Sequence, residues 1–200
     1  MRRLSPLLIA LALAVLLGAA LLLYPRLAAL TQRDALVQTS DGSQAPDSSQ
    51  ASDGSSQEQA PQAAPDFTVT DQEGNQVSLS DFQGQPVVLN FWASWCGPCQ
   101  QEMPHFEEAY QEYGQEIHFL MVNLTGSRDE TVETAQAFIQ ENAYSFPIYF
   151  DASYSASIAY GVSGVPVTYF IDAQGGLVAW ANGMLDQDTL ERGIGMIAPA

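Results

Sequence analysis

The sequence is poor in residues that bind metal ions or cross-link small proteins: its 200 residues include only two cysteines and two histidines. A zinc-ribbon array or a disulfide scaffold requires more cysteines than this, so both classes are excluded. The histidines, His105 and His118, do not form a paired spacing that would complete a zinc site. We therefore expect no metal ion and no other cofactor.

Positive charge is also scarce, because all six basic residues are arginines and none is a lysine. They stand against 23 acidic residues, which gives a formal net charge of −17. From Asp66 to the C-terminus, 18 acidic residues are accompanied only by Arg128 and Arg192. Such a surface would repel a phosphate backbone, so nucleic acid is excluded as a partner.

One segment lacks large apolar residues altogether. Gln38–Pro65 contains 28 residues with no Val, Ile, Leu, Met or aromatic among them. Such a composition cannot bury enough apolar surface to offset the entropy lost on ordering, so we predict a disordered linker over residues 34–65. It would act either as a tether that gives the next domain reach above a membrane or as a filler without a required length.

The long apolar run of the chain lies within residues 1–33. Leu7–Tyr24 is 18 consecutive uncharged residues, preceded by Arg2 and Arg3. As a helix it would be roughly 27 Å long, close to the hydrocarbon thickness of a bilayer. We predict a single-pass transmembrane anchor over residues 7–24 with a cytoplasmic N-terminus. A cleaved secretory signal is the alternative, since nearby alanines would permit cleavage. The main domain is then expected on the extracytoplasmic side of the cell membrane.

Residues 66–200 have the length of one domain. Short apolar runs alternate with helical patterns, which indicates an α/β or α+β fold. Gly175-Gly176 between two β-rich runs predicts a hairpin. Strands are predicted over residues 67–70, 77–79, 87–92, 117–124, 148–150, 167–171 and 177–181, and helices over residues 99–113, 131–142, 154–160 and 187–197.

Local patterns add detail to these helices. Ser127 and Glu130 have the spacing of a capping box before the second helix, and Asp186 is a plausible cap of the last. In the first helix, one set of residues has the spacing of a buried stripe: Met103, Phe106, Tyr110 and Tyr113. Four acidic residues are expected to form a solvated face: Glu107, Glu108, Glu112 and Glu116.

The stretch Cys96-Gly97-Pro98-Cys99 lies between a strand pattern and a helix pattern. Cys96 is therefore expected at a helix N-terminus, where free N–H groups and the helix dipole lower the pKa of its thiol. Pro98 suits the first turn, and Cys99 is expected one turn deeper, shielded from solvent. This arrangement predicts a redox-active dithiol with an exposed attacking sulfur and a resolving sulfur. A zinc site, a structural disulfide and a peroxidatic cysteine fit the pattern less well.

Several motifs together resemble the TlpA/ResA-like, membrane-anchored family of thioredoxins over roughly residues 64–197. They are Trp95-Cys96-Gly97-Pro98-Cys99, Leu89-Asn90-Phe91-Trp92, the run from Cys99 through Glu102 to the helix-kinking Pro104, Gly164-Val165-Pro166, Pro65-Asp66-Phe67 and Val77-Ser78-Leu79. The resemblance implies an α/β thioredoxin fold, with a central mixed β-sheet flanked by helices and an N-terminal β extension. It also implies that Pro166 follows a cis peptide bond.

The resemblance assigns roles to individual residues. Asn90 stands where ordinary thioredoxins have a buried aspartate that accepts a proton, so another base is needed for Cys99. Glu102 matches the acidic residue of the family pattern and is the expected base; the alternative is a surface glutamate without function. The partner's strand is expected to bind against a further set of residues: Trp95, Gly97, Pro98, Val165 and Pro166.

The sequence thus predicts an extracytoplasmic thiol–disulfide oxidoreductase that reduces disulfides of protein substrates through Cys96 and Cys99. The resemblance implies apocytochrome c as a substrate, in cytochrome c maturation, and a membrane thiol transporter of the CcdA type as electron donor. General thiol–disulfide exchange or an oxidase role is the main alternative. A thiol peroxidase lacks support because its Pro-x-x-x-Thr-x-x-Cys signature is absent. A non-catalytic adaptor that uses the acidic surface is the remaining alternative.

Overall fold

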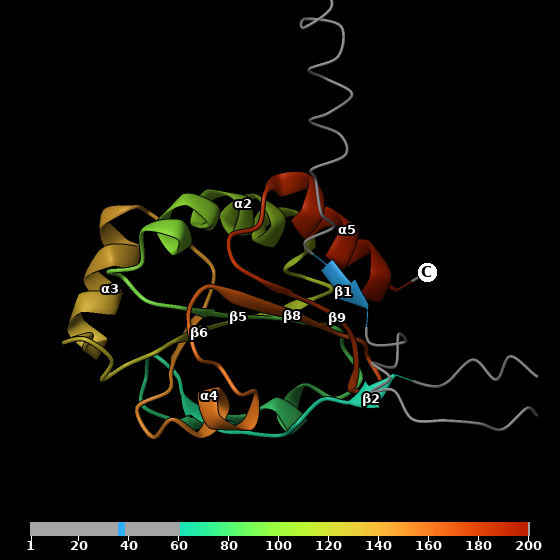
Figure 1. The fold of residues 1–200 in the computed structure, drawn as a ribbon, viewed down its shortest axis with the longest axis horizontal. Coiled ribbons are helices and arrows are strands. Elements are labelled where there is room, and N and C mark those ends of the chain that lie inside the picture. Colours follow the sequence, from blue (N-terminus) through green and yellow to red (C-terminus); the bar gives the residue numbers. More distant parts are fainter. Residues whose placement is uncertain (1–35, 39–60, 200) are drawn as a thin grey trace, which may run out of the picture. The chain divides into compact units, whose positions relative to one another are not determined.

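The computed structural model describes residues 36–38 and 61–199 of the chain (Figure 1). The predicted transmembrane helix over residues 7–24 and most of the predicted linker lie outside the described residues. Among the helices that are described, none has the length and apolar character needed to cross a bilayer.

A mixed β-sheet forms the centre of the domain. Its middle strands are β6 (His118–Asn123), β5 (Val87–Trp92), β8 (Val167–Ile171) and β9 (Gly176–Asn182), in that order. β6 runs parallel to β5, whereas β8 runs antiparallel to β5 and β9 antiparallel to β8. All six residues of β5 are buried, which explains why its sequence is apolar apart from Asn90.

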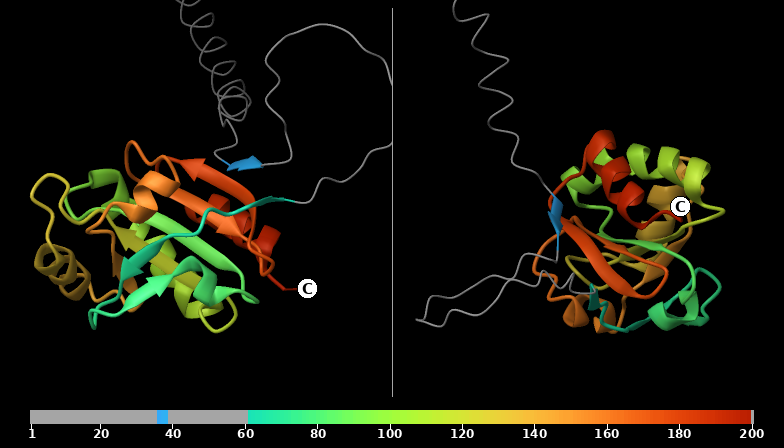
Figure 2. Two further views of the ribbon diagram at one scale, coloured as in Figure 1. Left: turned by 90° about the horizontal axis from the view of Figure 1, so that it is seen from below. Right: turned by 90° about the vertical axis from the view of Figure 1, so that its right-hand side faces the viewer.

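Short strands extend both edges of this sheet. Beyond β6 lie β7 (Ile148–Phe150) and then the hairpin of β3 (Thr68–Thr70) and β4 (Gln76–Ser78). At the opposite edge, β1 (Leu36–Gln38) and β2 (Gln62–Ala63) both pair with β9. The chain therefore crosses one face of the sheet between β2 and β3 (Figure 2). The β3–β4 hairpin is the expected N-terminal β extension.

The pairing of β1 and β2 corrects the predicted linker at its two ends. Leu36–Gln38 and Gln62–Ala63 fall inside the range 34–65, yet both are strands of the sheet. The free edge of a strand such as β9 offers unpaired N–H and C=O groups, and these can pair even with β2, which has no large apolar side chain. Composition alone does not reveal such backbone pairing.

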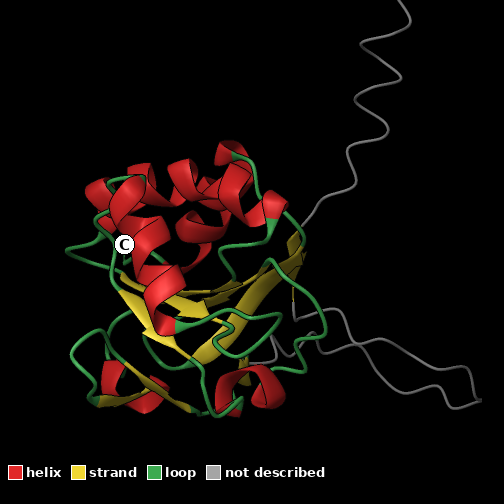
Figure 3. Ribbon diagram, turned by 90° about the vertical axis from the view of Figure 1, so that its left-hand side faces the viewer, coloured by secondary structure: helices red, strands yellow, loops and turns green. Residues whose placement is uncertain are grey.

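Helices cover both faces of the sheet (Figure 3). On one face lie α2 (Gly97–Tyr113), α3 (Val132–Glu141) and α5 (Gln187–Ile197), which share a core with the sheet. On the other face lie α4 (Ser155–Ala159) and a 3₁₀ turn, η1 (Leu79–Phe82), over a second core. Burial of apolar side chains in these two layers is the main stabilising contribution.

Most element predictions are confirmed within a residue or two, including the β8–β9 hairpin and the Asp186 cap of α5, which accepts a hydrogen bond from the Thr189 N–H. The capping box of Ser127 and Glu130 is wrong. The cap of α3 is Thr131, paired with Thr134, and Glu130 is buried with its carboxylate bonded elsewhere. The observed cap, Thr131, lies four residues after Ser127 and directly before the first residue of α3.

The first helix differs in two details from its prediction. It begins at Gly97, because Pro98 is accommodated in the first turn. Among the acidic residues expected to be solvated, Glu107 is half-buried and accepts hydrogen bonds from the N–H and hydroxyl of Ser145, both at 2.7 Å. It therefore holds α2 to the segment before β7.

Candidate active site

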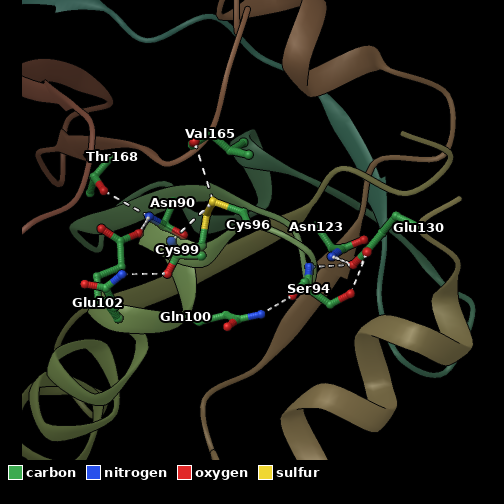
Figure 4. Close-up of a disulfide and its surroundings, with 12 residues drawn as sticks. Asn90, Ser94, Cys96, Cys99, Gln100, Glu102, Asn123, Glu130, Val165 and Thr168 are labelled. Carbon is green, nitrogen blue, oxygen red and sulfur yellow. Dashed lines mark hydrogen bonds between the residues drawn. A yellow bond between two sulfur atoms is a disulfide. The ribbon is translucent and has the colours of Figure 1, made fainter. Parts of the chain in front are cut away.

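A disulfide joins Cys96 and Cys99 where β5 passes into α2 (Figure 4). Cys96 is the N-cap of α2, and its sulfur accepts a hydrogen bond from the Cys99 N–H at 3.2 Å. Gly97 and Pro98, the first two residues of α2, are exposed between the cysteines. Free N–H groups of a first helical turn stabilise a negative charge on the N-cap sulfur when the disulfide is reduced.

The two sulfurs differ less in exposure than the sequence suggested. Cys99 is fully buried, as expected, but Cys96 is also only 4% exposed. The carbonyl oxygen of Val165, in the loop before β8, lies 3.6 Å from the Cys96 sulfur and covers it. Val165 precedes a cis peptide bond to Pro166, which confirms the expected backbone form of this loop. A partner must therefore approach Cys96 between this loop and the exposed turn.

Trp95 forms one wall of this approach. It is 37% exposed, and its Nε1–H donates a hydrogen bond to the Ser127 carbonyl at 3.2 Å. The guanidinium carbon of Arg128 lies 4.5 Å from the centroid of the indole ring. The indole is thus held by the loop that follows β6, 32 residues further along the chain.

Glu102 is fully buried, so the alternative of a solvated surface glutamate is wrong. Its Oε2 accepts a hydrogen bond from the Leu185 N–H at 2.9 Å, and its Oε1 accepts one from Asn90 Nδ2 at 3.0 Å. Burial raises the pKa of Glu102 to about 7, although these two hydrogen bonds act in the opposite direction. A carboxyl with this pKa can both accept and release a proton at neutral pH.

Asn90 connects Glu102 to the sheet. Its Nδ2 also donates to Thr168 Oγ1 at 3.0 Å, whereas its Oδ1 is buried and, among the described residues, has no hydrogen-bond partner. An unpaired buried acceptor is costly. The O–H of a protonated Glu102 could satisfy it once the amide rotates. The Asn90 side chain can therefore donate a hydrogen bond to an ionised Glu102 and accept one from a protonated Glu102.

Glu130 is a second buried carboxylate near the disulfide, 3% exposed. It accepts hydrogen bonds from the Ser94 N–H at 2.8 Å, from the Ser94 hydroxyl at 2.6 Å and from Asn123 Nδ2 at 2.7 Å (Figure 4). Ser94 is also tied to α2, because Gln100 Nε2 donates to its carbonyl at 2.6 Å. The segment that leads into Cys96 is thus fixed by a carboxylate 36 residues away along the chain.

Comparison with known proteins identifies the family of this domain. The sequence model of the AhpC/TSA family matches residues 60–180. The chain belongs to this family. Among curated members, it is 36% identical over 139 residues to the thiol-disulfide oxidoreductase ResA of Bacillus thuringiensis subsp. konkukian, an alignment that covers 68% of this chain and 77% of that relative. It is 38% identical over 117 residues to the thioredoxin-like protein YneN of Bacillus subtilis, covering 58% and 68% of the two chains.

Solved structures of related proteins have a similar fold. StoA from Bacillus subtilis has a TM-score of 0.57 at 26% identity, covering 66% of this chain and 98% of that one. The exposed lipoprotein thioredoxin Etrx1 of Streptococcus pneumoniae has a TM-score of 0.58 at 30% identity, covering 65% and 98%. The ResA-like relatives, the thioredoxin-like fold and the Cys96–Cys99 pair together make this family member a thiol–disulfide oxidoreductase.

The structure of this AhpC/TSA-family domain brings the predicted site residues together around one disulfide, at the start of α2 and beside the loop before β8: Trp95, Cys96, Gly97, Pro98, Cys99, Glu102, Val165 and Pro166. Sequence reasoning missed Glu130, whose spacing indicated a helix cap, and the position of Arg128 on Trp95. Within the described residues, no group of three or more side chains suited to a metal ion is present.

Proposed function

We propose that this oxidoreductase works as a reductase of protein disulfides on the extracytoplasmic side of the cell membrane, anchored by residues 7–24. The observation that supports the two-step dithiol chemistry is the buried Glu102, 0% exposed and with a pKa raised to about 7, three residues after the resolving Cys99. A dithiol that donates electrons must lose the proton of its buried thiol, and a nearby carboxyl of this pKa can take it.

In the first step, the Cys96 thiolate attacks one sulfur of the partner's disulfide. A Cys96–partner disulfide forms, and the other sulfur of the partner leaves as a thiolate. The N–H of Cys99 and the first turn of α2 stabilise the attacking anion. The carbonyl of Val165, 3.6 Å from the Cys96 sulfur, marks where the partner's strand would run.

In the second step, the Cys99 thiol gives its proton to Glu102 and attacks the Cys96 sulfur. The Cys96–Cys99 disulfide forms, and the partner leaves with its second thiolate, which takes up a proton. The two electrons come from the enzyme dithiol. Another protein must restore that dithiol, and we propose a membrane thiol transporter of the CcdA type. The membrane location is supported by the apolar run Leu7–Tyr24 and by the name of one structural relative, an exposed lipoprotein.

The proposed substrate is apocytochrome c, whose haem-attachment cysteines must be reduced in cytochrome c maturation. Its support is the resemblance to the TlpA/ResA-like family. Incubation of the reduced protein with oxidised apocytochrome c, followed by thiol counting on the product, tests this assignment. An unrelated disulfide peptide reduced at the same rate would indicate general exchange instead.

The reduction potential separates a reductase from an oxidase. Equilibration of the full-length chain with glutathione or dithiothreitol buffers, followed by alkylation and mass measurement, gives the fraction of dithiol. We expect a potential near that of thioredoxin, about −270 mV, because Gly97-Pro98 stands between the cysteines. A value close to about −120 mV, the range of strong oxidants, would overturn the reductase assignment.

A further inference from the structure

The loop between β6 and α3 is built against the active-site segment. Glu130, at its end, holds the N–H and hydroxyl of Ser94, and the Ser127 carbonyl accepts the Trp95 indole N–H. The loop is also braced internally, because the Ser127 N–H donates to the Leu124 carbonyl at 3.1 Å and the Gly126 N–H to the Glu130 carbonyl at 2.7 Å. Its position beside Trp95 is therefore fixed.

This loop presents Arg128 at the entrance to the disulfide. The side chain is exposed, and its guanidinium carbon lies 4.5 Å from the centroid of the Trp95 ring. Arg128 and Asp129 have φ angles of 47° and 64°, a left-handed backbone that non-glycine residues adopt at a cost. Within the part of the chain that the structure describes, no ion pair of Arg128 is formed.

The position of this cation contrasts with the charge of the domain. From Asp66 onward the sequence has 18 acidic residues, and its other basic residue is Arg192 in α5. A carboxylate that approaches such a surface is repelled over most of it. Beside Trp95 it instead meets a guanidinium, whose N–H groups can bind both oxygens of a carboxylate.

We propose that Arg128 is a specificity-determining residue that binds a carboxylate of the partner, close to the disulfide that Cys96 attacks. The inference rests on the proposed reductase function. It identifies the preferred partner as a protein or peptide with an aspartate or glutamate beside its disulfide. The Trp95 ring and the Glu130 anchor hold the cation at that place.

Three synthetic peptides test the proposal. They share one Cys-x-x-Cys disulfide and differ in one flanking residue, which is Asp, Asn or Arg. The full-length protein is reduced, freed of reductant and mixed with each peptide, and the second-order rate constant of peptide reduction is measured at low and high salt. We expect the Asp peptide to react about two- to fivefold faster than the Asn peptide, the range for one exposed ion pair. High salt should diminish the difference.

Variants of the arginines provide the controls. Arg128→Gln should abolish the preference for the Asp peptide, Arg128→Glu should reverse it in favour of the Arg peptide, and Arg128→Lys should retain part of it. Arg192→Gln should behave as the unchanged protein. Equal rates for all three peptides, or a preference for the Arg peptide in the unchanged protein, would overturn the role of Arg128 while leaving the reductase function intact. Failure to reduce any of the peptides would instead contradict the proposed function itself.

Discussion

Asn90 Nδ2 donates a hydrogen bond to Glu102 Oε1 at 3.0 Å, in a layer where neither residue has any exposed surface. Asn90 belongs to β5 and Glu102 to α2, so the pair joins the sheet to the helix that carries both cysteines. The asparagine occupies the position where the thioredoxin pattern has an acid. The acid is instead on the helix, and the amide holds it in place.

The first prediction concerns Glu102 as the base for Cys99. Glu102→Gln should slow disulfide reduction at neutral pH by roughly tenfold or more, because a positioned base contributes about 10²–10⁴ to such a step. It should also remove the inflection near pH 7 that the pKa of Glu102, about 7, imposes on the rate. Stopped-flow measurement of peptide reduction between about pH 5 and 9, around the reference thiol pKa, would give both quantities.

The matched control is Glu108→Gln, which removes an exposed carboxylate from the same helix. Its rate profile should follow that of the unchanged protein. Coincident profiles for the two variants would remove Glu102 from the mechanism and leave water as the proton acceptor.

A second prediction follows from the same pKa. Burial raises the pKa of Glu102 from its ordinary 4.5 to about 7, so between these values the folded state binds a proton that the unfolded state has lost. This contribution to stability is fully present below about pH 4.5 and is lost as the pH rises through about 7. The rise of the pKa from 4.5 to about 7 corresponds to roughly 3 kcal/mol of stability. Urea unfolding of the oxidised protein should show this decline, and the same titration of Glu102→Gln should lack it.

The third prediction concerns the order of the two cysteines. Cys99→Ser should accumulate mixed disulfides with partner proteins, because Cys96 can still attack but nothing resolves the product. Cys96→Ser should accumulate none, since Cys99 is fully buried. Non-reducing gel electrophoresis after acid quenching would detect the adducts. Equal trapping by both variants would refute the assignment of attacking and resolving sulfurs.

The fourth prediction concerns Glu130 as a positioning residue. Glu130→Ala leaves the Ser94 N–H and Asn123 Nδ2 without their acceptor, at a cost of about 1–3 kcal/mol for each buried donor. We expect lower stability in urea and disulfide exchange slower by about tenfold. Glu130→Gln should recover most of the rate, because an amide can still accept from both donors and donate to the Ser94 hydroxyl.

Glu107→Ala is the control for this experiment, since Glu107 binds the N–H and hydroxyl of Ser145 in the same way but at another place in the fold. It should change stability without changing the exchange rate. If Glu130→Ala lowered the stability without slowing disulfide exchange, the role of Glu130 would be structural only.

The fifth prediction concerns location. The intact chain should fractionate with membranes and resist extraction at alkaline pH. Protease added outside cells with an intact cytoplasmic membrane should cut within Gln38–Pro65 and release a soluble domain that retains Cys96 and Cys99. Recovery of the full chain in the cytosol would contradict both the anchor and its orientation.

Much of this protein is determined by local sequence. The strand Val87–Trp92 lies at its predicted residues, and the helix that follows it begins within the Cys96-Gly97-Pro98-Cys99 stretch. The α5 cap at Asp186 and the β8–β9 hairpin were likewise predicted correctly. These features depend on side-chain periodicity, on turn residues and on hydrogen bonds that span a few residues. The same local order places Cys96 at a helix N-terminus, and this position stabilises its thiolate.

The tertiary structure decided how the two acids near the disulfide are held. Glu102 is buried because the Leu185 segment, 83 residues away, packs over it and donates a hydrogen bond to its carboxylate. Glu130 does not cap α3, because its carboxylate accepts hydrogen bonds from the N–H and hydroxyl of Ser94, 36 residues earlier in the chain. In the sequence, only the family resemblance sets Glu102 apart as the expected base, and Glu130 has the spacing of a helix cap. Whether a carboxylate is solvated or buried, and therefore its pKa and its role, depends on donors and apolar surface supplied by distant segments.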